Sequence, residues 1–182
     1  DIRRTEDGVA MQVTVDRPGR PLMAKRAGDE VEIGIEDGRL ITPAQRRKIY
    51  ATLNDIAQHT GYTPEAAKQV MKVEHMLRVG CTEYFSLSDC SVSTAREFIN
   101  TLMDYALREG IILSDMALGR TDDIDTYLHQ CLKYRKCCIC GRQADLHHVD
   151  AIGMGRDRSR IDDSMMLKAA LCRVHHSIAH QM

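Results

Sequence analysis

The sequence predicts an α+β protein, in which a small N-terminal domain of strands followed by helices precedes a C-terminal finger rich in cysteine and histidine. Residues 9–15 and 30–36 alternate apolar and polar side chains, which is the period of half-buried strands. After residue 42 the apolar residues recur every three or four positions, which is the period of helices. Five of the seven cysteines and six of the eight histidines lie after residue 128, a concentration typical of metal-binding fingers.

Two helices are predicted to begin at threonine–proline pairs. Thr42 before Pro43 is typical of an N-cap followed by proline at the first helical position, and Thr63 before Pro64 repeats the signal. Gly61 is predicted to end the first of these helices. That helix has an apolar stripe at helical spacing, formed by Ile49, Leu53, Ile56 and Ala57.

Two more helices are predicted further along the chain. Residues 94–108 form the clearest amphipathic segment, and Gly110 lies just past its end. The preceding segment, 84–88, is predicted to be a short strand or an extended link, and a short helix is expected around 124–134. The apolar face of the amphipathic segment carries Phe98, Leu102 and Tyr105.

The polar stretch 119–125 is the candidate domain boundary. It divides the chain into an N-terminal domain, 1–118, a linker and helix, 119–130, and a C-terminal module, 131–182. Residues 127–182 carry nine Lys or Arg against five Asp or Glu, whereas the rest of the chain carries sixteen against twenty-one. A basic module joined to an acidic one indicates nucleic-acid contact at one end only.

The sequence contains no segment that predicts entry into a membrane. The N-terminus lacks the apolar core of a signal peptide, and no apolar run has the length of a bilayer-spanning helix. The odd number and tight clustering of the cysteines indicate metal binding in a reducing compartment, not a disulfide framework. We therefore expect a cytoplasmic protein with no membrane partner. The chain begins with Asp1 and not with methionine, so one interpretation is that it is a fragment of a longer protein.

Two chelating pairs predict a structural zinc site. Cys137-x-x-Cys140 and Cys172-x-x-His175 supply the four ligands of a tetrahedral ion. A module of roughly fifty residues is too small to fold on hydrophobic burial alone, and structural Zn²⁺ contributes on the order of 10–16 kcal/mol. The alternative is a redox CxxC beside an unrelated buried cysteine, but redox pairs normally follow a strand in a βαβ unit, which the sequence lacks.

The remaining histidines of the finger predict a second site. His176 and His180 are four residues apart on a predicted helix, so they share a face and can bind one ion together. His147 and His148 are neighbours in a strand-like stretch, so their side chains point to opposite sides. One of that pair can bind a metal ion while the other addresses a substrate. Phosphodiester hydrolysis needs this division, because a cation neutralises developing charge while a neutral imidazole takes a proton from the attacking water.

The motifs CxxC, LHHVDAIGMGRDR and LCRVHHSIAH together resemble the HNH endonucleases, in particular those of phages, over residues 131–182. The resemblance implies a zinc-stabilised ββα-metal finger. In that finger His147, His176 and His180 would bind the catalytic metal, and His148 would be the general base. The catalytic ion would be Mg²⁺, Mn²⁺, Ni²⁺ or Zn²⁺.

The segment between the histidine pairs carries a basic loop and a departure from the family pattern. Arg156, Arg158 and Arg160 alternate along a glycine-containing stretch, which is typical of a loop that binds phosphates, although a solvated basic loop is the alternative. The middle asparagine of the HNH name has no clear counterpart. Ser164 or Lys168 occupies its neighbourhood.

Residues 35–112 resemble the phage NinB/Orf recombination proteins. The segments ITPAQRRKIYATLNDIAQHTGY and YFSLSDCSVSTAREFINTLMDYALREGI carry the resemblance, with Gln45-Arg46-Arg47-Lys48 as its most distinctive patch. The resemblance implies a docking domain that is associated with single-stranded DNA and with single-strand-binding protein, and that forms a homodimer. The alternative is that the basic quartet is a solvated helix end.

The function predicted from these observations is that of a metal-dependent endonuclease that cuts DNA during phage recombination or DNA processing, in the cytoplasm of a bacterial host cell. One alternative is a non-catalytic, DNA-binding recombination mediator in which all the histidines bind zinc in a structural finger. A protein-interaction adaptor, in which the finger is a structural cap, is another alternative.

Overall fold

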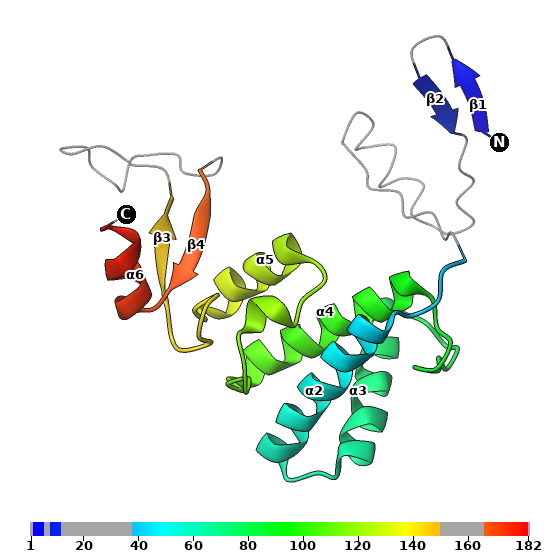
Figure 1. The fold of residues 1–182 in the computed structure, drawn as a ribbon, viewed down its shortest axis with the longest axis horizontal. Coiled ribbons are helices and arrows are strands. Elements are labelled where there is room, and N and C mark those ends of the chain that lie inside the picture. The colour runs from blue at the N-terminus through cyan, green and yellow to red at the C-terminus, as the bar shows by residue number, and fades with distance from the viewer. Residues whose placement is uncertain (1, 6–7, 12–37, 150–165, 182) are drawn as a thin grey trace. The chain divides into compact units, whose positions relative to one another are not determined.

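The computed structural model describes residues 2–5, 8–11, 38–149 and 166–181, and the chain forms two compact units, residues 1–35 and 36–182. In the first unit, β1 (Ile2–Thr5) and β2 (Gly8–Met11) form an antiparallel hairpin (Figure 1). β2 overlaps the strand predicted over 9–15, whereas β1 was not predicted. The strand predicted over 30–36 lies outside the described residues.

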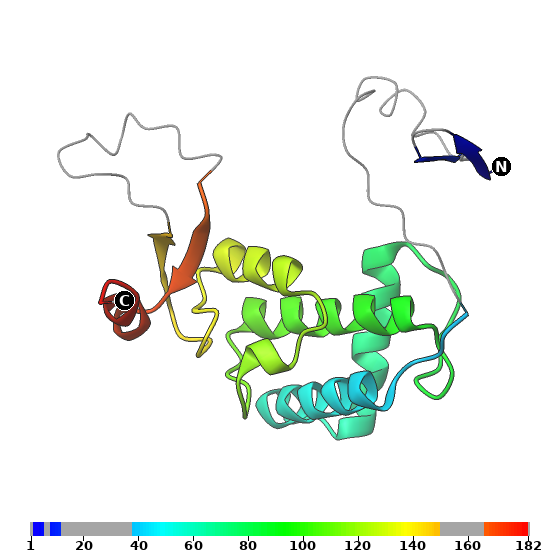
Figure 2. The ribbon, with the colours of Figure 1, turned by 45° about the horizontal axis from the view of Figure 1, so that its top comes forward.

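The second unit combines a set of packed helices with a small hairpin. Helices α2, α3 and α4 pack on one another, and α5 lies against α4 and against β4 (Figures 1 and 2). This mixture of helices and short strands confirms the α+β fold class. Of the helices within the described ranges, none combines the length and hydrophobicity that crossing a membrane requires. In chain order the elements are α2 (Pro43–Thr60), α3 (Pro64–Val79), α4 (Val92–Glu109), the 3-10 helix η1 (Ala117–Gly119), α5 (Ile124–Tyr134), β3 (Asp145–His148), β4 (Lys168–Leu171) and α6 (Arg173–Ala179).

The helix ends lie where the capping residues predict them. Thr42 Oγ1 accepts a hydrogen bond from Gln45 N at 3.1 Å, and Gln45 Oε1 accepts one from Thr42 N at 3.0 Å, which completes a capping box before α2. Thr63 Oγ1 caps α3 by accepting a hydrogen bond from Ala66 N at 3.2 Å. Gly61 ends α2 with a φ of 76°, a left-handed conformation that glycine adopts without a steric penalty.

The hydrophobic core runs from the helices into the cysteine-rich end. The predicted apolar face of α2 is buried, with Ile49 and Leu53 among the least exposed side chains. On α4, Phe98 and Leu102 are buried, whereas Tyr105 is half-buried. The same cluster continues through Cys131 of α5 to Leu171 of β4. Helix α5 contacts both α4, before the predicted linker 119–130, and β4, after it. The division of the chain into two functional domains at this linker stays a prediction.

The basic quartet at the start of α2 contributes to the fold. Gln45 caps the helix, Arg46 donates to the carbonyl oxygens of Leu87 and Ser88 at 3.1 and 2.9 Å, and Lys48 pairs with Asp122. Three of the four side chains therefore bind protein groups. The segment 84–88, which Arg46 contacts, is not a strand, and its end belongs to a turn that the hydrogen bond from Cys90 N to Ser86 O closes at 2.9 Å.

Candidate metal centres

The four predicted ligands of the structural zinc converge in the structure. Cys137 and Cys140 lie on the loop between α5 and β3, Cys172 is the N-cap of α6, and His175 lies in its first turn. Their ligand atoms all lie within 4.8 Å of one another. Cys140 Sγ is 3.7 Å from Cys172 Sγ, and His175 Nδ1 is 3.3 Å from Cys172 Sγ and 3.4 Å from Cys137 Sγ. A tetrahedral ion with Zn–S bonds of about 2.3 Å separates its sulfur ligands by about 3.8 Å. The cluster therefore fits a four-coordinate metal ion.

Backbone hydrogen bonds fold the Cys137–Cys140 segment into a tight turn. Gly141 N donates to Cys137 O at 2.8 Å, and Cys137 N donates to Arg142 O at 2.7 Å. Gly141 has a φ of 69°, which an L side chain rarely adopts, so glycine is favoured at this position. Cys138 N donates to Ala170 O at 3.0 Å and ties the turn to β4. The turn thus presents both cysteines toward Cys172 and His175.

The thiols of this cluster differ in acidity. Burial raises the pKa of Cys140, but hydrogen bonds from Arg142 and from neighbouring groups outweigh that effect and lower the pKa to about 6. Arg142 Nε lies 3.4 Å from Cys140 Sγ, a contact that the sequence analysis missed. Burial raises the pKa of Cys137. Since metal ligands must be thiolates, an ion at this site would have to displace a proton from Cys137.

A second cluster consists of three histidines. His147 lies on β3. His176 lies in α6, and His180, one turn later, directly follows the last residue of that helix. The ring centroids are 4.7 Å apart for His147 and His176, 5.0 Å for His147 and His180, and 4.6 Å for His176 and His180. One nitrogen of each ring lies within 4.8 Å of the others. Three imidazoles leave coordination positions for water or substrate, so this cluster could hold a metal ion of the kind found in catalytic sites.

His147 is held in the form that binds metals. Its side chain is only 9% exposed. Burial, followed by the positive charge that His176, His180 and His148 can acquire, lowers the pKa of His147. The neutral imidazole, which is the ligating form, is therefore favoured.

The β3–β4 hairpin separates the two neighbouring histidines. His147 lies opposite Ala169 and contacts the rings of α6, whereas His148 lies opposite Lys168. Because successive strand residues point to opposite faces, His148 lies on the face turned away from the three-histidine cluster. Within the described ranges His148 belongs to neither group of ligand atoms. The predicted phosphate-binding residues Arg156, Arg158 and Arg160 lie outside the described residues.

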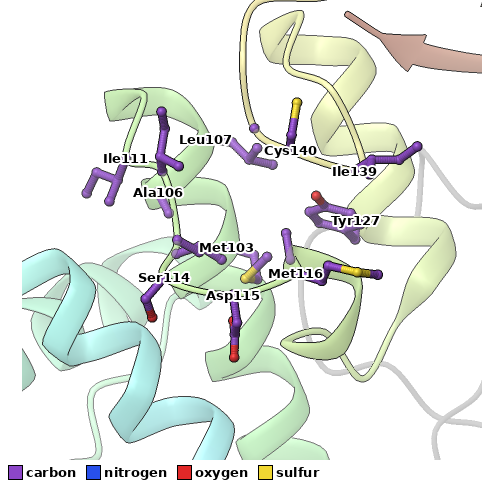
Figure 3. A pocket seen from close by; sticks show the side chains of 14 residues that line it. Met103, Ala106, Leu107, Ile111, Ser114, Asp115, Met116, Tyr127, Ile139 and Cys140 are labelled. Atoms are coloured by element: carbon purple, nitrogen blue, oxygen red, sulfur yellow. The ribbon is translucent and has the colours of Figure 1, made fainter. Parts of the chain in front are cut away.

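An apolar cavity of about 250 Å³ lies between α4, α5 and the turn that carries Cys137 and Cys140 (Figure 3). Met103 and Leu107 of α4, Tyr127 of α5 and Ile139 of the cysteine turn line it, and Cys140 forms part of its wall. Tyr127 Oη donates to Cys138 O at 3.0 Å, which fastens the turn to α5. A phosphodiester is charged and needs cationic or polar partners, so this cavity does not suit one.

One family of known proteins matches the chain. The family described as "Putative HNHc nuclease" matches residues 11–182. No curated protein and no solved structure gives a significant match. The match covers the helices as well as the finger on which the resemblance to HNH endonucleases rests. The NinB/Orf resemblance and the phage origin stay predictions. The chain therefore belongs to the HNHc nuclease family.

Proposed function

We propose that the chain is a metal-dependent endonuclease that hydrolyses phosphodiester bonds of DNA. The observation that carries the proposal is the presence of two separate sets of metal donors in one small finger. The set of three cysteines and one histidine is complete for a tetrahedral ion, so a purely structural finger has no need of the set of three histidines. Membership of a nuclease family supports hydrolysis as the use of the second set.

The first set is proposed to bind the structural Zn²⁺. Its ligands join the turn after α5 to the start of α6, two segments that are 32 residues apart at Cys140 and Cys172. An ion there would fix the direction of α6 against the hairpin. The proposed ligands are Cys137, Cys140, Cys172 and His175.

The second set is proposed to hold the catalytic cation, which would be Mg²⁺, Mn²⁺, Ni²⁺ or Zn²⁺. Such a cation supplies charge neutralisation at the scissile phosphate and the leaving oxygen. His148 is proposed to take the proton from the attacking water as general base. Its position outside the donor set supports this role, because metal binding by His147, His176 and His180 does not compete with it.

The substrate is proposed to be DNA handled in phage recombination or DNA processing. Arg156, Arg158 and Arg160 would bind backbone phosphates beside the catalytic cluster. The excess of basic residues over 127–182 supports nucleic-acid contact by this end of the chain. Residues 1–118 are proposed to dock on DNA intermediates or on single-strand-binding protein, as a homodimer, on the strength of the NinB/Orf resemblance alone.

The proposal is tested by incubating supercoiled plasmid with the protein and with Mg²⁺, Mn²⁺, Ni²⁺ or Zn²⁺ added separately. The wild type is expected to nick or linearise the plasmid. His148→Ala is expected to reduce the rate by about 10²–10⁴, which is the usual contribution of a general base, with unchanged zinc content and DNA binding. His59→Ala is the matched control, because His59 is an exposed histidine in the last turn of α2. It is expected to cleave like the wild type.

The other outcomes separate the alternatives. A folded, zinc-loaded protein that binds DNA but cuts with none of these metals would be a recombination mediator. Cleavage that survives in His148→Ala would mean that another group is the base. Binding that does not weaken as salt rises would favour the protein adaptor, since phosphate contacts depend steeply on salt.

A further inference from the structure

The β3–β4 ladder brings a lysine beside the proposed general base. His148 of β3 lies directly opposite Lys168 of β4. The next pair along the ladder is Val149 with Leu167, in which Val149 N donates to Leu167 O at 2.9 Å. Hydrogen-bonded and non-hydrogen-bonded pairs alternate in an antiparallel ladder. His148 and Lys168 therefore form a non-hydrogen-bonded pair, the type in which the Cα atoms are only about 4.5 Å apart and the side chains are closest.

A second contact supports the same assignment. Ala170 O accepts a hydrogen bond from Cys138 N at 3.0 Å, so the backbone polar groups of Ala170 point out of the hairpin and away from β3. Residues two apart on a strand share this orientation. The backbone of Lys168 therefore also points away from β3, as the non-hydrogen-bonded pair requires.

The two side chains share one face of the hairpin. His147 faces α6, so His148 and its cross-strand partner Lys168 lie on the opposite face. At the other end of that face Ala170 is 1% exposed. The end of the face that carries His148 thus combines an imidazole and an ammonium group.

We propose that Lys168 is a further catalytic residue, whose ammonium group binds a non-bridging oxygen of the scissile phosphodiester beside His148; this inference rests on the proposed nuclease function. Lys168 has three N–H donors and no acceptor, so it complements the base and cannot replace it. A phosphodiester gains negative charge as water attacks, and a fixed cation stabilises that charge most strongly in the transition state. The proposed metal ion, bound by the three histidines, would neutralise part of the negative charge on the phosphodiester. Lys168 would neutralise another part from the hairpin face that carries His148.

The experiment compares Lys168→Met, which keeps an unbranched side chain and removes the charge, with Lys168→Arg, which keeps the charge. Lys133→Met is the control, because Lys133 is an exposed lysine of α5 outside both clusters. Single-turnover plasmid nicking and the binding of a short DNA duplex across a range of salt concentrations are measured on the zinc-loaded protein. Lys168→Met is expected to lower the nicking rate by about 10²-fold, as removal of one transition-state donor does, and to reduce the salt slope of binding by about one phosphate contact. Lys168→Arg is expected to retain most of the activity, and Lys133→Met all of it.

The two readouts separate this inference from the nuclease proposal. Lys168→Met with the rate and salt slope of an active wild type would overturn the role of Lys168 and leave the nuclease standing. A wild type that never cuts, but whose salt slope falls in Lys168→Met alone, would support the phosphate contact while the nuclease proposal fails. An unchanged slope in an inactive protein would overturn both. If Lys168→Met loses its zinc, the test rests on Lys168→Arg. An arginine variant that keeps its zinc but loses the activity or the salt slope of the wild type would contradict a role based on charge.

Discussion

Replacing Cys140 with serine is expected to unfold the C-terminal finger and leave helices α2 to α4 folded. Helix α6 has seven residues, none of them buried, and strands β3 and β4 have four residues each. Isolated helices shorter than about 12–15 residues and isolated two-stranded hairpins are marginal in water. We therefore expect the finger to depend on the proposed zinc ligands for order.

The size of the effect follows from comparing the ion with the apolar contacts. Structural Zn²⁺ contributes on the order of 10–16 kcal/mol, so the loss of one ligand in four removes about 2.5–4 kcal/mol if the contributions are equal. The largest buried apolar side chain of the hairpin is Leu171, whose burial contributes about 1.5–3 kcal/mol. A single lost ligand thus costs at least as much as a typical buried apolar side chain such as Leu171 contributes.

Hydrogen exchange and zinc analysis check this expectation. Amides of β3 and β4 should lose protection in Cys140→Ser, whereas those of α4 should keep it. Cys81→Ser is the matched control, because Cys81 is an exposed thiol outside both clusters, and it should exchange like the wild type. A Cys140→Ser protein that binds one zinc per chain as tightly as the wild type and keeps protection in β3 and β4 would refute the assignment of this ligand.

Two further predictions concern buried groups of the helical part. Arg120 is 5% exposed, and its Nη2 lies 3.3 Å from Asp55 Oδ2. Arg120→Ala therefore leaves a buried carboxylate without its cation. Urea titrations should show a free energy of unfolding lower by about 3–5 kcal/mol. Arg108→Ala, which breaks only exposed pairs, should cost less than about 1 kcal/mol, and equal losses would contradict the argument. Burial, with a smaller contribution from Arg78, lowers the pKa of His75 in the folded protein. The imidazole of His75 therefore binds a proton more readily in the unfolded chain. The free energy of unfolding should accordingly fall as the pH drops below about 6.5. His75→Gln should make that fall shallower, and identical pH profiles for the two proteins would rule out the contribution of His75.

Features encoded by neighbouring residues could be predicted from the sequence. The caps Thr42 and Thr63 act on amides three residues away, so the starts of α2 and α3 are readable from a few letters. The helix expected around 124–134 occurs with those bounds. The pairs Cys137–Cys140 and His176–His180 also follow from spacing, because a two-residue spacer in a turn and a four-residue spacer on a helix bring donors together. The choice of His147 over His148 depended on the resemblance to the HNH endonucleases.

Features that depend on distant partners could not be predicted. The quartet that begins at Gln45 looked like a DNA-binding patch or a solvated helix end, but the carbonyl groups that bind Arg46 are more than forty residues away. Strand β4, with the sequence KAAL, has no alternation and is a strand because β3 pairs with it. Arg120 is a charged residue in a polar stretch, and only the folded arrangement of Asp55 and Asp115 explains its burial.

The order of the ligands on α6 makes the two proposed metal ions interdependent. His175 belongs to the first cluster and His176, the next residue, to the second. Successive residues of a helix point about 100° apart, so one orientation of α6 has to serve both clusters, and an ion that fixes this orientation through His175 also positions His176. Each ion that binds thereby selects the helix orientation that its counterpart needs. Such coupling is reciprocal: loading the cysteine-rich cluster should raise the affinity of the three histidines for their cation, and filling the histidine cluster should raise the affinity of the cysteine-rich cluster for zinc by the same free energy.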